Sequence, residues 1–182
     1  MSDDRRHWLK VNRAPVLTLW AAVVAERLGF DRDEALTLGR AVAGLNAYSK
    51  GRSLGIFEPG EKKQVKEKKR SLEEGGTLKI DLLHRAVPAT RKDGEIRALS
   101  KDEPVSPDSV RRYLEKKFGD ALDETREAMT ALAGAYRPQE LADRAYALYE
   151  EFRPDVPAGR KGWGAEGRLY LDTIRRLADQ AD

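Results

Sequence analysis

The sequence has no cysteine, only two histidines and no long apolar run. Without cysteine there is no disulfide bond, thiol nucleophile or cysteine-ligated zinc. The two histidines have neither HxxxH nor HxH spacing, which excludes a histidine-rich metal site. No stretch approaches the roughly 18 apolar residues of a membrane span, and residues 1–10 lack the apolar core of a signal peptide. The cytoplasm is therefore the expected location, and no membrane partner is expected.

Recognised catalytic motifs are also missing. The sequence contains neither the G-x-S-x-G motif nor a P-loop. Asp81 and His84 lie close together in the sequence, but such a pair is more typical of a surface salt bridge than of a catalytic base and its orienting carboxylate. We therefore expect a non-enzymatic protein with no catalytic residues and no cofactor.

Charge is abundant and unevenly placed. Of the 182 residues, 36% are charged and 40% are hydrophobic, with a formal net charge of +3. This balance is typical of a globular chain with a strongly charged surface. The segment from Lys50 to Arg70 contains eight basic residues and only three acidic ones. A cluster of this kind is either a solvated segment or a surface for an anionic partner.

Two segments near the start predict a helical hairpin. Residues 16–28 repeat apolar side chains at helical spacing, between Pro15 in the first turn and Gly29 as the C-terminal cap. Asp31 and Glu34 form an acidic capping box for a second helix.

Small residues punctuate that second helix. Gly39 and Gly44, with the alanines between them, predict a slim face that lets the first helix approach closely.

The middle of the chain has a β pattern. Residues 78–82 alternate between apolar and polar, and segments 87–90 and 95–99 flank Asp93-Gly94, a typical hairpin turn. Pro88 predicts that its strand lies at an edge, because proline has no N–H to donate. We expect a small antiparallel hairpin of up to three short strands.

Helical patterns then return. Ser106 and Pro107 begin one helix, residues 121–135 form the next, Pro138 begins a third, and residues 170–178 repeat at helical spacing. The predicted fold is therefore multi-helical, mainly α with a small antiparallel β-hairpin, an α+β class.

The predicted organisation has three parts. Residues 1–58 form an N-terminal helical hairpin, residues 59–76 a basic, glycine-flanked linker or arm, and residues 77–182 a β-hairpin with a helical body. One continuous domain is the alternative.

The stretch GWGAEG, from Gly162 to Gly167, has the G-x-G-x-x-G spacing of a dinucleotide-binding loop. The residues before it hold two prolines, and those after Gly167 leave no room for a returning strand. Its context therefore argues against nucleotide binding and favours a structural turn leading into the last helix, with Trp163 packed on the helical body. As the alternative, Arg160, Lys161 and Arg168 supply positive charge and Trp163 a stacking face for an auxiliary phosphate contact.

The basic clusters favour a protein that binds DNA or RNA through its surface. The expected phosphate contacts of the arm are Lys62, Lys63, Lys66, Lys68, Lys69 and Arg70. A second contact strip, formed by Arg111, Arg112 and Lys116, would act with the basic hairpin as a helix and a wing do on a duplex. The alternative is a homodimeric interaction module, in which the first hairpin, with Trp8 and Trp20 nearby, pairs with a second copy.

Two resemblances accompany this interpretation. The segments PVLTLWAAVVAERLG, VSPDSVRRYLEKKFGDAL and ALYEEFRPDVPAGRKGWG are similar to those of a family of bacterial proteins with no established activity, which implies a bacterial cytosolic origin and no site residues. The first hairpin also resembles the opening helices of HD-type metal phosphohydrolases. That family places a His-Asp pair where this chain has Leu45 and Asn46, so its metal chemistry does not carry over.

Overall fold

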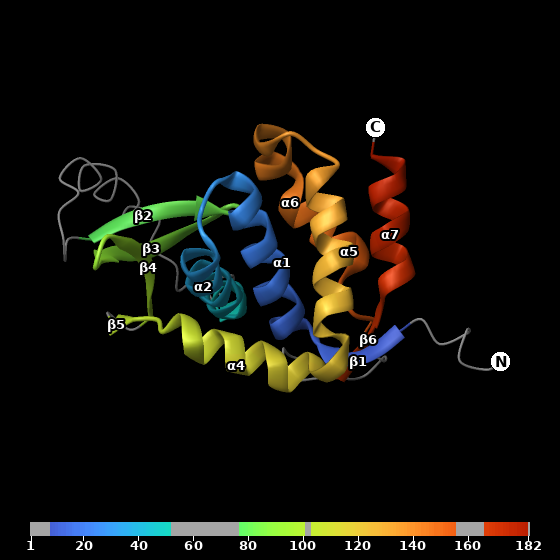
Figure 1. Cartoon of the computed structure of the whole chain (residues 1–182), viewed down its shortest axis with the longest axis horizontal. Coiled ribbons are helices and arrows are strands. Elements are labelled where there is room, and N and C mark those ends of the chain that lie inside the picture. Colours follow the sequence, from blue (N-terminus) through green and yellow to red (C-terminus); the bar gives the residue numbers. More distant parts are fainter. Residues whose placement is uncertain (1–7, 52–76, 101–102, 156–165, 182) are drawn as a thin grey trace.

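The computed structural model of the chain describes residues 8–51, 77–100, 103–155 and 166–181. Helices form the body of the molecule, and a small antiparallel β element lies at each end of it (Figure 1). The predicted class, mainly α with a minor β part, is confirmed. No helix in the described ranges has the length and apolar character that crossing a membrane requires.

The first helix, α1 (Arg13–Leu28), lies at the centre of the body. Every residue from Pro15 to Ala25 is buried, because α2, α4, α5 and α6 all pack against this helix. Trp20 is fully buried, and its indole Nε1 donates a 2.9 Å hydrogen bond to the Ala145 carbonyl on α6. Gly29, with φ of 118°, caps the helix as predicted, since a left-handed conformation there suits glycine.

The second helix, α2 (Arg32–Gly51), begins with the predicted capping box. The Asp31 side chain accepts from the Glu34 N–H at 2.9 Å, and the Glu34 side chain accepts from the Asp31 N–H at 3.1 Å. At Gly39 the two helices nearly touch, because a Cβ there would lie 2.4 Å from the Thr18 carbonyl oxygen of α1. Gly44 faces open space, so the slim face predicted to include it ends earlier.

Four strands form the larger sheet, in the order β2 (Thr77–Leu82), β3 (Arg85–Lys92), β4 (Glu95–Ser100) and β5 (Glu103–Pro104). Asp93 and Gly94 form the predicted hairpin turn, and their φ of 53° and 82° are those of a type I′ turn. Leu83 and His84, with φ of 50° and 63°, make a similar turn between β2 and β3 without any glycine. The sheet has one strand more than expected.

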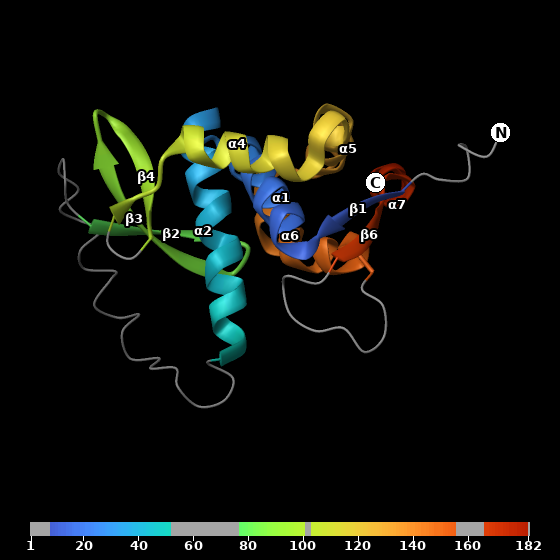
Figure 2. The same ribbon diagram turned by 90° about the horizontal axis from the view of Figure 1, so that it is seen from below.

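The edge position predicted from Pro88 is wrong, since β3 lies between β2 and β4 (Figure 2). Antiparallel pairing alternates from the turn, which leaves Pro88 opposite Lys79 in a non-hydrogen-bonded pair. The missing N–H would therefore face β4, and the β3–β4 ladder begins only at Ala89. A central strand tolerates proline at this position because no ladder bond is removed.

Side chains of α2 satisfy the free edge of β4. The Ile96 N–H donates to Glu34 Oε2 at 2.9 Å, and the Ala98 N–H donates to Thr37 Oγ1 at 3.0 Å. Both amides point away from β3, and Ala98 is fully buried. Helix α2 therefore covers the sheet and also supplies the acceptors that its edge needs.

A second, two-stranded sheet was not predicted. Strand β1 (Trp8–Asn12) pairs antiparallel with β6 (Glu166–Tyr170), and we call this pair the terminal ribbon. Asp155 forms an isolated bridge on β6, exchanging hydrogen bonds of 3.0 and 2.9 Å with Arg168. A Cβ at Gly167 would lie 2.8 Å from the Asp155 carbonyl oxygen and from Pro154 Cβ, so only glycine fits there.

The remaining helices follow the sequence predictions closely. They are α4 (Pro107–Phe118), α5 (Leu122–Gly134), α6 (Pro138–Phe152) and α7 (Leu171–Gln180), with a short 3₁₀ turn at Gly119–Ala121. Helix α7 begins one residue later than its periodicity predicts, because Tyr170 ends β6. One hydrophobic cluster joins α1 and α2 to the sheet and the later helices, so the described parts of ranges 1–58 and 77–182 share a core.

Candidate functional site

Most of the residues predicted to contact nucleic acid lie outside the described ranges. These are Lys62, Lys63, Lys66, Lys68, Lys69, Arg70, Arg160, Lys161 and Trp163. Residues 59–61 and the first part of GWGAEG, up to Ala165, are also outside them. The structure therefore places only the strip on α4, which contains Arg111, Arg112 and Lys116.

Local sequence explains why α4 forms and how it is held. Ser106 caps the helix by accepting from the Ser109 N–H at 3.3 Å, and Pro107 occupies its first turn. Its inward face is buried through Val110, Leu114 and Phe118. This spacing is the amphipathic pattern of a helix packed on one side and hydrated on the other.

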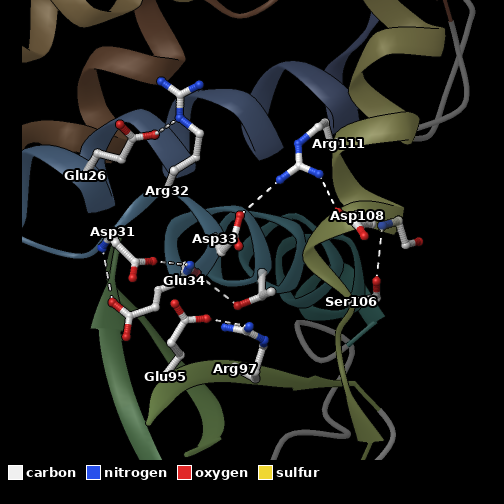
Figure 3. A network of polar contacts seen from close by, with 12 residues as sticks. Glu26, Asp31, Arg32, Asp33, Glu34, Glu95, Arg97, Ser106, Asp108 and Arg111 are labelled. Atoms are coloured by element: carbon white, nitrogen blue, oxygen red, sulfur yellow. Dashed lines mark hydrogen bonds and ion pairs between the residues drawn. The ribbon is translucent and has the colours of Figure 1, made fainter. Parts of the chain in front are cut away.

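Both flanks of α4 are tied to α2. On one flank Arg111 bonds to Asp108 on its own helix and to Asp33 of α2 at 3.0 Å (Figure 3). On the other flank the guanidinium of Arg40, from α2, lies 4.7 Å from the ring centroid of Tyr113. Burial raises the pKa of the Tyr113 hydroxyl. The contacts of Arg111 and Tyr113 with α2 together fix the rotation of α4 about its own axis.

This arrangement separates Arg111 from the other two residues of the predicted strip. The hydrogen bond to Asp108 is the main cause that raises the pKa of Arg111 above its ordinary value. Its side chain is 41% exposed, yet it already contacts two carboxylates. Arg111 therefore serves to position α4, and a phosphate would have to compete with Asp33 and Asp108 for its guanidinium.

Arg112 and Lys116 stand on the outward side of α4. They are one helical turn apart, both are exposed, and neither forms an ion pair with any residue of the described ranges. Lys117, beside them, is also exposed and unpaired there. Residues at i and i+4 lie on the same helix face. We call Arg112, Lys116 and Lys117 the α4 basic stripe.

A second polar cluster is structural. Glu26 Oε2, at the end of α1, lies 3.6 Å from Arg32 Nε and 3.6 Å from Arg126 Nη1 on α5. Desolvation, helped by Arg32, lowers the pKa of Arg126. Figure 3 shows Glu26 and Arg32 beside the capping box of α2. The cluster joins the α1–α2 connection to α5 and presents no outward cationic surface.

The outward face of the terminal ribbon brings together residues that sequence reasoning did not combine in one site. The register places Trp8 opposite Tyr170 and Lys10 opposite Arg168. The Arg168 guanidinium lies 4.9 Å from the centroid of the Trp8 ring. Leu9 and Val11 alternate with Trp8 and Lys10 in the sequence, which is a β signal. The alternation spans too few residues to be distinguished from an irregular arm.

Acidic and histidine side chains are the candidates for metal binding or proton transfer in the described ranges. Within them, no group of three or more His, Asp or Glu side chains is placed to hold a metal ion. Asp81 and His84 are exposed around the β2–β3 turn and do not form the ion pair that their spacing predicts. The positive φ of His84 turns its side chain away from the alternation of the strand.

Comparisons with known proteins return no similar protein. No family model matches the chain, and neither a curated protein nor a solved structure is detectably similar to it. The resemblances to a bacterial family and to HD-type helices therefore stay predictions.

Proposed function

We propose that this chain is a non-enzymatic protein that binds DNA or RNA through basic surfaces. The observation that carries the proposal is the α4 basic stripe. Its side chains are exposed, lack ion-pair partners in the described ranges, and project from a helix that is held by its core face and by both flanks. Exposed cations on a rigid helix lose little conformational freedom when they meet a row of phosphates.

The sequence adds a second reason. The arm between Lys62 and Arg70 concentrates positive charge in a segment that lies outside the described ranges. Phosphate contacts of this kind are independent of base sequence and sensitive to salt, because each one releases condensed counterions. A bacterial cytoplasmic location would suit such a role.

The homodimer alternative is weakened at the feature that suggested it. Helix α1 is enclosed by helices of its own chain, and Trp20 is buried in that core. The first hairpin therefore has no free α1 face to offer a second copy. Dimerisation through another surface stays a prediction without a specific contact behind it.

The test is fluorescence anisotropy of a labelled duplex across a salt series. The double variant Arg112→Gln/Lys116→Gln should weaken binding at low salt. It should also reduce the slope of log K against log salt by about 0.9 for each phosphate that the variant no longer neutralises. The same should follow when the six basic residues of the arm are neutralised.

The matched control is Arg144→Gln/Arg176→Gln, which removes two arginines that are exposed on α6 and α7. It should leave both the affinity and the slope unchanged. Arg111→Gln should lower the thermal stability of the protein and leave the salt slope nearly unchanged, because Arg111 is already engaged by Asp33 and Asp108. The proposal is wrong if the protein binds neither duplex nor single strand at low salt. It is also wrong if neutralising these basic residues does not weaken binding.

A further inference from the structure

The terminal ribbon has one face in the core and one face outside it. Its inward residues are Leu9, Val11, Gly167 and Leu169, of which Val11 and Leu169 are 3% and 0% exposed. Opposed residues of an antiparallel pair stand on the same side of a sheet. Trp8, Tyr170, Lys10 and Arg168 therefore share the outward face.

The two aromatic residues of that face are unusual for this protein. Trp20 and Tyr149 are buried in the core, and each contacts the buried Phe152 ring edge to face. Trp8 and Tyr170 are half-buried, and they belong neither to the core cluster nor to the side chains packed against it. Packing of the core therefore does not explain why rings of this size stand there.

The charges of the ribbon complement an anion. Lys10 and Arg168 lie opposite each other and are exposed, and Arg168 forms no ion pair with any carboxylate among the side chains that the structure describes. The guanidinium of Arg168 covers part of the Trp8 ring and keeps N–H groups available for a phosphate. The exposed side chain of Asp155, whose backbone bridges to Arg168, limits the net positive charge.

Rings next to cations suit a nucleic acid whose bases are unpaired. Unpaired bases offer their flat faces to aromatic side chains and to arginine planes, while their phosphates pair with nearby cations. In a duplex those base faces are stacked inside the helix and are not accessible. Rings on opposed strands of a ribbon provide the kind of platform on which successive bases stack.

We propose that the outward face of the terminal ribbon is a stacking platform for single-stranded nucleic acid. Trp8 and Tyr170 contact bases, and Arg168 contacts the phosphates between them. The inference rests on the proposed function and deepens it, because it names the form of nucleic acid that this face selects. The α4 basic stripe has no aromatic residue on its outward line and does not distinguish the two forms.

The experiment measures the anisotropy of three labelled probes: an oligothymidylate, an oligouridylate and a blunt-ended duplex of two strands. Trp8→Ala should weaken binding of the two single strands about 5- to 150-fold, the loss expected for one stacked base. Tyr170→Ala should act in the same direction. Duplex binding should change little in either variant. Trp8→Phe keeps a ring and should retain most of the single-strand affinity.

A matched pair of arginines isolates the cation. Arg168 lies over Trp8 in the ribbon, and Arg144 lies 5.6 Å from the ring centroid of Tyr136 on the helical body. Arg168→Gln should weaken single-strand binding, and Arg144→Gln should not. Thermal unfolding of each variant checks that the fold is kept. If Trp8→Ala does not fold, the single variant Arg168→Gln tests the platform in its place, and Trp8→Phe is the variant that should keep single-strand binding.

The outcomes separate this inference from the proposed function. Unchanged single-strand affinity in Trp8→Ala and Tyr170→Ala, with weakened duplex binding in the α4 double variant, overturns the platform and leaves nucleic-acid binding standing. Equal losses on duplex and single strand also overturn the platform. No binding of any probe by the wild-type chain overturns both proposals.

Discussion

The two β regions of this protein lie at opposite ends of one helical body and arise in different ways (Figures 1 and 2). The four-stranded sheet joins strands that follow one another in the chain. The terminal ribbon joins β1 to β6, which are separated by nearly the whole sequence. Tight turns bring neighbouring strands together locally, whereas distant strands pair only after the helices between them have packed.

The two regions also differ in their outer surfaces. The sheet directs apolar side chains onto α2, and its edge amides are satisfied by Glu34 and Thr37. The ribbon directs aromatic and basic side chains outward. The four-stranded sheet is therefore packed into the helical body, whereas the terminal ribbon leaves one of its faces on the surface. Four predictions test this difference, in order of decreasing expected effect.

The largest effect is expected where both regions depend on the same support. Gly39→Ala places a Cβ 2.4 Å from the Thr18 carbonyl oxygen and should separate α1 from α2, lowering the free energy of unfolding by about 3 kcal/mol. Sheet and ribbon should then melt in one transition at a lower temperature, as followed by circular dichroism.

Gly44→Ala is the matched control, since a Cβ there meets nothing within 4 Å. It should raise the free energy of unfolding by about 0.5–1 kcal/mol through helix propensity. Equal effects of the two substitutions would contradict the close approach at Gly39.

The ribbon should fail alone in Gly167→Ala. The new Cβ would lie 2.8 Å from the Asp155 carbonyl oxygen, so β6 must move away from its bridge at a cost of about 2 kcal/mol. Hydrogen exchange should become faster for amides of β1 and β6 and stay unchanged in β3 and β4. An equal decrease of protection at both ends would show that the regions are not separable.

The sheet edge should weaken in Thr37→Val. The substitution removes the acceptor of the Ala98 N–H and leaves that buried amide without a partner, at a cost of about 1–2 kcal/mol. Exchange should become faster in β4, and the ribbon should not respond. Thr18→Val is the control, because the Thr18 hydroxyl only donates to a carbonyl of its own helix. A loss of stability in Thr18→Val as large as in Thr37→Val would contradict the role of the edge contact.

The smallest effect is expected at the β2–β3 turn. His84 adopts φ of 63° without being glycine, so His84→Gly should raise the free energy of unfolding by about 0.5 kcal/mol. Ala86→Gly, in the strand that follows, should lower it by a similar amount. Chemical denaturation of both variants checks the sign, and destabilisation by His84→Gly would mean that the histidine side chain holds the turn.

Sequence reasoning recovered the features whose cause lies within a few residues. Gly29 ends its helix, Asp31 with Glu34 begins the next, and Asp93-Gly94 makes its hairpin turn. It missed the Leu83-His84 turn because neither residue is a glycine and leucine rarely adopts positive φ. It misplaced Pro88 because the residues of a strand do not show how many other strands pair with it.

The candidate site was predictable in part. That α4 carries basic residues on an outward side follows from periodicity. That Arg111 is engaged by Asp33 while Arg112 is not follows only from how α4 lies on α2. The role of Gly167, which appeared as part of a nucleotide-like motif, is a close contact with a segment that lies before it in the chain.

The sequence by itself therefore determined the helices, their caps, the Asp93-Gly94 hairpin turn and the excess of basic charge, because each depends on side chains a few residues apart. The tertiary structure alone decided which cations are paired, which strand is central and that β1 meets β6. These outcomes depend on contacts between distant segments, whose positions are set only when the core around α1 closes.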